Sequence, residues 1–108
     1  MTLEHITHYL KEDEGLNPHQ LSQHLLWLAG EYAFQATGWE RIQKEKPEVW
    51  LKLRDQCTSD TQAERKWNKT ESGINEIILR NKLRVIEKLM SSIKARLRVM
   101  ESEARNQF

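Results

Sequence analysis

The stretch LRNKLRVIEKLMSSIKARLRVM, residues 79–100, decides the fold. Its apolar side chains recur at alternating spacings of four and three, the heptad pattern of a helix that buries one continuous seam. The seam consists of Leu79, Leu83, Ile86, Met90, Ile93, Leu97 and Met100. It is widened on one side by Ile78, Val85, Leu89 and Val99. A seam this broad favours a bundle helix with two neighbours over a two-stranded coiled coil, and we expect it to be a protein interface in an oligomer.

Basic side chains of the same helix project away from the seam. Projected at about 100° per residue, they gather on the opposite side, as Arg80, Arg84, Lys88, Lys94, Arg98 and Arg105. The first five are the candidate nucleic-acid-binding residues, because lysine and arginine neutralise phosphates. The alternative is a solvated face, which every amphipathic helix needs. The single sign of the charges keeps the phosphate hypothesis open, since a solvated surface usually mixes signs.

A second helix is predicted over residues 17–56. Asn17 can cap it, Pro18 suits the first helical position, and Gln20 can complete a capping box. Pro47 should bend or break this helix, because proline lacks the N–H donor and clashes with the preceding turn. The apolar register nevertheless resumes beyond Pro47.

Two other helix starts follow from local signals. Thr2 can cap a short helix within residues 1–15. Ser59 and Gln62 form a second capping box, which predicts a long C-terminal helix over residues 60–104, with a possible break near Gly73. Together these segments predict one all-α domain over residues 1–108, an antiparallel helical bundle or long helical hairpin with a coiled-coil-like C-terminal helix.

The composition agrees with long helices that expose much of their surface. Apolar residues make up 38% and charged residues 31% of the chain, which holds only 4 glycines and 2 prolines. The net charge of +1 hides an asymmetry, because residues 1–40 carry six acidic side chains and one lysine, whereas residues 80–108 carry eight basic and three acidic ones. Such asymmetry can serve a polyanionic partner or be satisfied between antiparallel helices.

The sequence also points to a cellular compartment. Cys57 is the only cysteine, so the fold needs no oxidising environment, and we expect a cytoplasmic protein. No run approaches the roughly 18 apolar residues that span a bilayer, and no signal-peptide pattern opens the chain. We therefore expect no membrane partner.

Few residues suggest a reaction centre. His5 and His8 lie one turn apart but have no complete ligand set, so no metal site is expected. Ser91 precedes Lys94 by three residues, as in some acyl-enzymes, but without companion motifs. With no phosphate-binding glycine loop and no catalytic carboxylate pair, we expect no enzyme, no cofactor and no small-molecule substrate. The four tryptophans, Trp27, Trp39, Trp50 and Trp67, are expected in the core or between helices rather than as base-stacking platforms.

Several segments resemble small helical proteins encoded by bacteriophages, often among early replication and recombination genes. The likeness covers residues 20–108. It lies in Leu25-Leu26-Trp27-Leu28 with Tyr32, in Ser59-Asp60-Thr61-Gln62-Ala63-Glu64-Arg65 with Trp67, in residues 89–99 (LMSSIKARLRV) and in residues 103–107 (EARNQ). The first helix lies outside it and is a candidate local addition.

This resemblance implies two kinds of binding protein, active in the host cell cytoplasm, and a third option stands beside them. The first is an oligomeric accessory factor that presents its basic residues to single-stranded DNA or to nucleic-acid-processing machinery. The second is an inhibitor of a host defence nuclease, similar to an anti-CRISPR protein, whose candidate residues are Glu4, Glu12, Asp13 and Glu14. The third is a purely structural oligomer.

Overall fold

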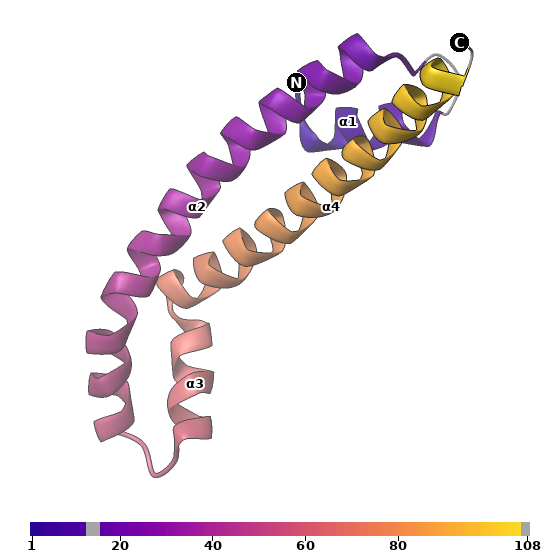
Figure 1. Ribbon diagram of the computed structural model, residues 1–108. Helices are drawn as coiled ribbons and strands as arrows, with labels where there is room; N and C mark the ends of the chain where they lie inside the picture. The colour runs from indigo at the N-terminus through magenta and orange to yellow at the C-terminus, as the bar shows by residue number, and fades with distance from the viewer. Residues whose placement is uncertain (13–15, 107–108) are drawn as a thin grey trace. The chain divides into compact units, whose positions relative to one another are not determined.

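The computed structural model describes residues 1–12 and 16–106, and within those ranges it contains four helices and no strand (Figure 1). The predicted all-α fold class is confirmed. The helices are α1 (Leu3–Lys11), α2 (Pro18–Asp55), α3 (Asp60–Lys69) and α4 (Glu71–Asn106). The structure groups the chain into two compact units: Met1–Ala33 with Arg84–Phe108, and Phe34–Leu83. The single domain over residues 1–108 stays a prediction. Each unit is described by itself.

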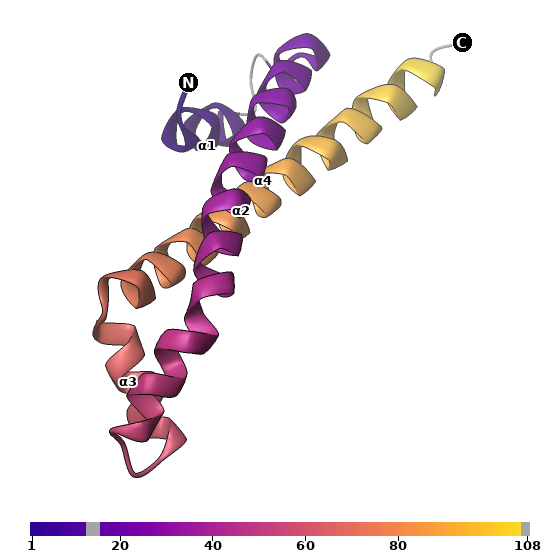
Figure 2. The same cartoon turned by 90° about the vertical axis from the view of Figure 1, so that its left-hand side faces the viewer.

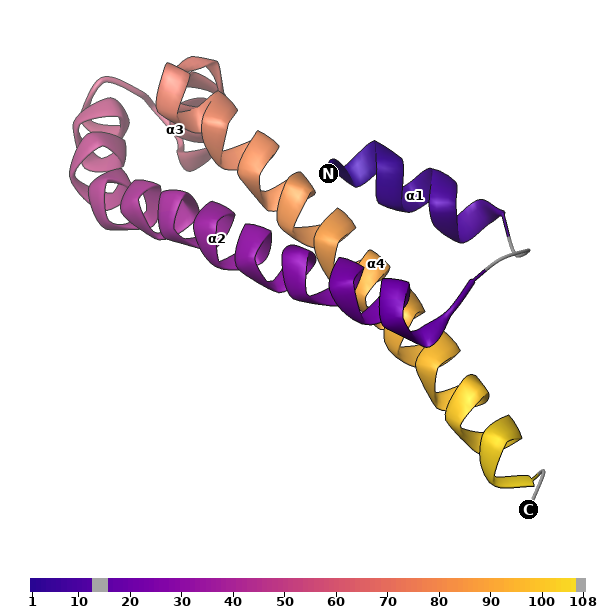
Figure 3. The ribbon, with the colours of Figure 1, turned by 90° about the horizontal axis from the view of Figure 1, so that it is seen from above.

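The first unit packs α1 against the beginning of α2 and the C-terminal part of α4. Figure 3 lets the short α1 be followed separately from the two long helices. The buried core takes two residues from each helix, namely Ile6 and Leu10, Leu21 and Leu28, and Ile86 and Ile93. These pairs are four or seven residues apart, so each lies on one face of its helix. The candidate addition α1 therefore supplies a third of this core.

Hydrogen bonds hold α1 to its neighbours. Thr2 caps the helix by accepting from the His5 backbone N–H at 3.0 Å. The Tyr9 hydroxyl donates to Oε1 of Gln20 at 2.7 Å. The Arg96 guanidinium donates to the Leu10 carbonyl at 3.1 Å. A carbonyl in the last turn of a helix has no partner within its own helix, so this arginine of α4 satisfies the end of α1.

The second unit contains a hairpin in which the last part of α2 reverses into α3, as Figures 1 and 2 both show. Ser59 caps α3 through the Gln62 backbone N–H at 3.2 Å. The Gln62 side chain accepts from the Thr58 backbone N–H at 3.1 Å, one residue before the usual capping-box partner. Arg54 closes the turn by donating to Asp60 at 2.6 Å and to the Cys57 carbonyl at 3.0 Å.

The chain breaks between α3 and α4 at Thr70, three residues before the predicted weak point at Gly73. The Thr70 backbone N–H and hydroxyl both donate to the Trp67 carbonyl, at 2.9 and 2.6 Å. The same hydroxyl accepts from the Gly73 N–H at 3.0 Å. A Cβ on Gly73 would lie 1.9 Å from the Trp67 oxygen. Thr70 therefore makes the break, and glycine is needed because the two backbones meet here.

Pro47 does not break α2, which runs through it as one helix from Pro18 to Asp55. The proline ring is exposed. Of the two apolar residues that resume the register beyond it, Leu53 is half-buried but Val49 is 40% exposed, so the register continues only in part. The helix begins at an Asn17 cap, whose side chain accepts from the Gln20 backbone N–H at 2.8 Å.

Candidate functional site

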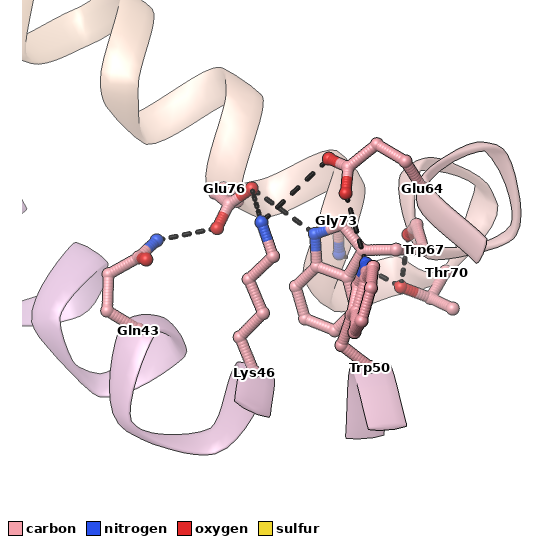
Figure 4. Close-up of polar contacts among 8 residues, drawn as sticks. All are labelled: Gln43, Lys46, Trp50, Glu64, Trp67, Thr70, Gly73 and Glu76. Atoms are coloured by element: carbon pink, nitrogen blue, oxygen red, sulfur yellow. Dashed lines mark hydrogen bonds and ion pairs between the residues drawn. The ribbon is translucent and has the colours of Figure 1, made fainter. Parts of the chain in front are cut away.

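A cluster of polar side chains around Glu76 is the most highly connected polar arrangement in the second unit (Figure 4). Glu76 comes from α4 and is 6% exposed. Its carboxylate accepts from the Gln43 amide at 2.5 Å, from the Trp67 indole N–H at 3.2 Å and from the Lys46 ammonium at 3.3 Å. These donors come from α2 and α3, so one carboxylate joins three helices.

The protonation state of Glu76 follows from these contacts. Burial raises the pKa of this carboxyl, but hydrogen bonds from Gln43, Trp67 and Lys46, together with the Lys46 charge, outweigh burial and lower the pKa below its ordinary value. The carboxylate is therefore ionised and held by three donors. A general base needs a free lone pair near a substrate. This carboxylate is instead held by three donors, so its geometry suits a structural role in which it connects the three helices.

Lys46 and Trp50 extend the cluster toward solvent. The Lys46 ammonium lies 5.3 Å from the centre of the Trp67 ring, within cation–π range, and 3.9 Å from Glu64. The Trp50 indole donates to Glu64 at 3.1 Å. A shallow depression of about 310 Å³ lies here, lined by Gln43, Lys46, Pro47, Trp50 and Glu64. Its polar lining is already paired, which leaves no preformed donor set for a ligand.

The basic face predicted on α4 is the second candidate. In the first unit it consists of Arg84, Lys88, Lys94 and Arg98, and all four side chains are exposed. Arg80 is also exposed and belongs to the second unit. No ion pair joins any of the five to a carboxylate within residues 1–12 and 16–106. Their charges are therefore available to an external anion.

Lys94 does not lie opposite the apolar seam as the helical projection suggested. It follows Met90 by four residues, which places the two about 40° apart on the helix. Both line a groove of about 430 Å³ between α2 and α4, together with Ala29, Tyr32, Glu87 and Ser91. The basic face of the first unit thus borders an apolar groove.

Glu87 is an acidic residue within this basic face, three residues after Arg84 and seven before Lys94. The Tyr32 hydroxyl donates to it at 3.0 Å. This hydrogen bond, followed by the Glu87 charge and then burial, raises the pKa of Tyr32. The contact holds the Glu87 carboxylate toward α2, where it partly offsets the positive charge of the face.

The apolar seam lies against the chain's own helices. Ile86 and Ile93 are completely buried in the core of the first unit, and Met90, Leu97 and Met100 pack against that core. In the second unit Leu79 and Leu83 are half-buried, and a methyl of Leu79 would lie 3.5 Å from a Cβ on Gly38. α1 and α2 therefore occupy much of the surface that the sequence offered as an oligomer interface.

Of the four acidic candidates near the N-terminus, the structure describes Glu4 and Glu12. Glu4 and Glu12 are exposed, and Glu12 accepts from the His8 ring at 3.1 Å. Asp13 and Glu14 lie outside the described residues. No group of three or more potential metal ligands gathers in the part of the chain that the structure describes, and no helix there is long and apolar enough to cross a membrane.

Sequence reasoning missed two buried polar residues. No sequence pattern indicates that Glu76 is buried, because its partners Gln43 and Trp67 are distant in sequence. His24 is 6% exposed, on the core side of α2. It meets the Tyr9 ring edge-on at a centroid distance of 4.7 Å, and its Nδ1 lies 3.4 Å from the Met1 sulfur. Its position three residues after Leu21 and four before Leu28 could have suggested burial.

The tryptophans occupy structural positions. Trp67 is completely buried, and Trp27, Trp39 and Trp50 are half-buried. The indole nitrogen of Trp39 is a buried donor without a hydrogen-bond partner among the described residues.

No protein family, no curated protein and no solved structure matches this chain. The resemblance to bacteriophage proteins is accordingly still a prediction, and the site alone carries the functional argument.

Proposed function

We propose that this chain is a non-enzymatic nucleic-acid-binding protein that contacts the phosphate backbone through the basic face of α4. The observation that supports the proposal is the exposure of Arg84, Lys88, Lys94 and Arg98 without acidic partners among the described residues. A face that served solubility alone would usually form ion pairs along the helix, and these four side chains form none among the described residues although Glu87 lies within the face.

The spacing of these residues suits a polyanion. Arg84 and Arg98 are separated by about 21 Å along the helix, at 1.5 Å per residue. Double-stranded DNA carries one charge per roughly 1.7 Å of its axis, so several phosphates lie within reach of the four side chains. Exposed basic side chains on a helix carry no rigid base-reading geometry, and we therefore expect binding with little sequence preference.

Such binding would make the protein an accessory factor to replication or recombination, the class implied by the likeness to phage proteins. Its place would be the cytoplasm, where a chain with the single cysteine Cys57 needs no disulfide. The tryptophans add no stacking platform to the face. Single-stranded DNA, the ligand that the phage likeness implies, would be held through its phosphates.

The test is fluorescence anisotropy with labelled single- and double-stranded DNA at several salt concentrations. Four phosphate contacts predict a slope of log K against log salt of about −3 for single strands and −3.6 for duplex. Affinity should then fall roughly 50- to 150-fold between 50 and 200 mM salt. Absent binding, or binding insensitive to salt, would remove the proposal.

A matched pair of variants assigns the binding to this face. Reversing Arg84, Lys94 and Arg98 to Glu should abolish binding. Reversing Arg41, Lys44 and Arg65 to Glu changes the net charge equally at exposed positions of the second unit and should retain most of it. Equal loss in both variants would show that net charge alone, rather than the basic face of α4, drives the association. Circular dichroism verifies that both triple variants are folded.

A further inference from the structure

The groove between α2 and α4 in the first unit lies directly on the proposed phosphate-binding face. We name it the α2–α4 groove; it holds about 430 Å³ and is lined by Ala29 and Tyr32 from α2 and by Glu87, Met90, Ser91 and Lys94 from α4. Its volume falls in the range of about 300–1,000 Å³ that small-molecule sites have. An aromatic ring, a thioether and a methyl group give it apolar walls, while a carboxylate, a hydroxyl and an ammonium group give it polar edges.

The polar residues of the groove belong to one row on α4 that begins and ends with an arginine. The row consists of Arg84, Glu87, Ser91, Lys94 and Arg98, at spacings of three and four, and it projects within an arc of about 80°. Arg84 lies one turn before the groove and Arg98 one turn after it. Neither arginine forms an ion pair among the described residues. A strand whose phosphates follow this row therefore passes over the groove.

The charge inside the groove disfavours a phosphate there and allows a neutral group. Glu87 lines the groove, and the Tyr32 hydroxyl holds its carboxylate toward α2 at 3.0 Å. This negative charge repels a phosphate. A nucleobase carries no charge, and its edges hold N–H donors and acceptors, to which the Glu87 carboxylate and the Ser91 hydroxyl can bond. The groove therefore suits the base of a nucleotide whose phosphate lies on Lys94.

The walls of the groove suit the flat face of that base. Bases stack on aromatic rings in proteins that bind single strands, and Tyr32 offers a ring that its hydrogen bond to Glu87 holds in place. Met90 is half-buried, and its flexible thioether adapts to irregular apolar surfaces. Ala29 is exposed, and its small methyl group leaves room for a planar ligand between the two helices.

A paired base cannot use this groove without leaving its duplex. Bases in a duplex are stacked and paired, so entry would cost unstacking and unpairing, whereas an unpaired base has no partner to lose. From these observations we infer that the α2–α4 groove binds one unpaired base of single-stranded DNA, while the neighbouring phosphates lie on Lys94 and the two arginines of the row. This binding mode rests on the proposed function and makes the single strand the preferred ligand.

Abasic DNA separates the base from the phosphates. Fluorescence anisotropy compares two labelled single strands of equal length, one with bases and one in which every nucleotide is abasic, so that both carry the same phosphate charge. The strand with bases should bind roughly 5- to 150-fold more tightly, the factor that stacking of one base provides. This ratio should persist when salt weakens both affinities. Equal affinities would overturn base binding and leave phosphate binding intact, whereas no binding of either strand would remove the proposed function as well.

Ala29→Leu assigns the base to this groove. The added side chain occupies the groove from an exposed position, and leucine favours a helix nearly as well as alanine; circular dichroism verifies the fold. The variant should lose the difference between the two strands and keep its affinity for the abasic one. The matched control Gln23→Leu adds a leucine at an exposed position of α2 in the same unit, about 120° away around the helix, and should retain the full difference. A full difference in Ala29→Leu, or equal loss in both variants, would overturn the assignment.

Discussion

The indole N–H of Trp67 donates to the carboxylate of Glu76 at 3.2 Å, and both side chains are buried. Trp39, in the same unit, also has a buried indole nitrogen but no partner among the described residues. The two tryptophans thus allow a comparison between a satisfied and an unsatisfied donor in one unit.

Replacing each tryptophan with phenylalanine should separate the two situations. Trp67→Phe removes a donor from a buried carboxylate and leaves a gap, and should lower the free energy of unfolding by about 2–4 kcal/mol. Trp39→Phe removes an unsatisfied donor, and should change it by less than about 1 kcal/mol. Urea denaturation measures both. A larger loss for Trp39→Phe would contradict the assigned role of Glu76.

Acid should destabilise the first unit through His24. Burial, and then the nearby His5 charge, lowers the pKa of His24 from its ordinary value of 6.5. The unfolded chain therefore binds a proton more readily, so the stability from neutral His24 is complete above about pH 6.5 and declines as the pH falls through the lowered pKa. The melting temperature should drop between pH 7.5 and pH 5.5, and less so in His24→Gln.

The control for this pH effect is His19→Gln, because His19 is exposed on the same helix. It should keep the full dependence on pH. If His24→Gln and His19→Gln behave alike in this range, the burial of His24 does not govern acid stability.

Glu76 should act at lower pH in the second unit. Its pKa is lowered from the ordinary value of 4.5 because its hydrogen bonds and the Lys46 charge outweigh burial. Its contribution to stability is therefore complete above about pH 4.5 and is lost as the pH falls through the lowered pKa. In Glu76→Gln the free energy of unfolding should depend less steeply on pH in this acidic range. If the pH dependence of the variant matched that of the unaltered chain, the Glu76 carboxylate would contribute little to stability.

Two glycines of the second unit should respond oppositely to alanine. Gly73→Ala would place a Cβ 1.9 Å from the Trp67 carbonyl oxygen and should destabilise the protein by on the order of 3 kcal/mol, because backbone has to move. Gly38→Ala meets the two Leu79 methyls at 3.5 and 4.0 Å, which is ordinary contact, and should be neutral or stabilising by up to about 1 kcal/mol. Thermal denaturation of both variants is the measurement; similar losses would count against the tight junction at Thr70.

Glu87→Gln should strengthen nucleic-acid binding. Glu87 lies within the basic face, and among the described residues its partner is the Tyr32 hydroxyl, whose hydrogen bond the amide oxygen of glutamine can also accept. Removing its charge should raise affinity several-fold at low salt, with a smaller gain at high salt. Anisotropy titrations at two salt concentrations check this. The exposed pair Glu101 and Arg105 offers Glu101→Gln as a control for net charge, and a larger gain there would place the contact elsewhere on α4.

The sequence by itself determined that the chain is helical and where α1, α2 and α3 begin. Caps at Thr2, Asn17 and Ser59 act on backbone groups three residues away, so local sequence is enough to locate them. The heptad spacing likewise placed Ile86 and Ile93 on the buried side of α4, because a helix converts spacing directly into a face. The exposure of the basic side chains followed from the same periodicity.

Only the tertiary structure decided what each face meets. Periodicity predicts that the seam is buried but not against which helix, because the hydrophobic effect is non-directional. The assembly of Gln43, Lys46 and Trp67 around Glu76 depends on α2, α3 and α4 coming together, and no local spacing encodes it. The clash that reserves position 73 for glycine depends equally on the turn at Thr70, because a close approach of two backbones exists only once the chain has folded.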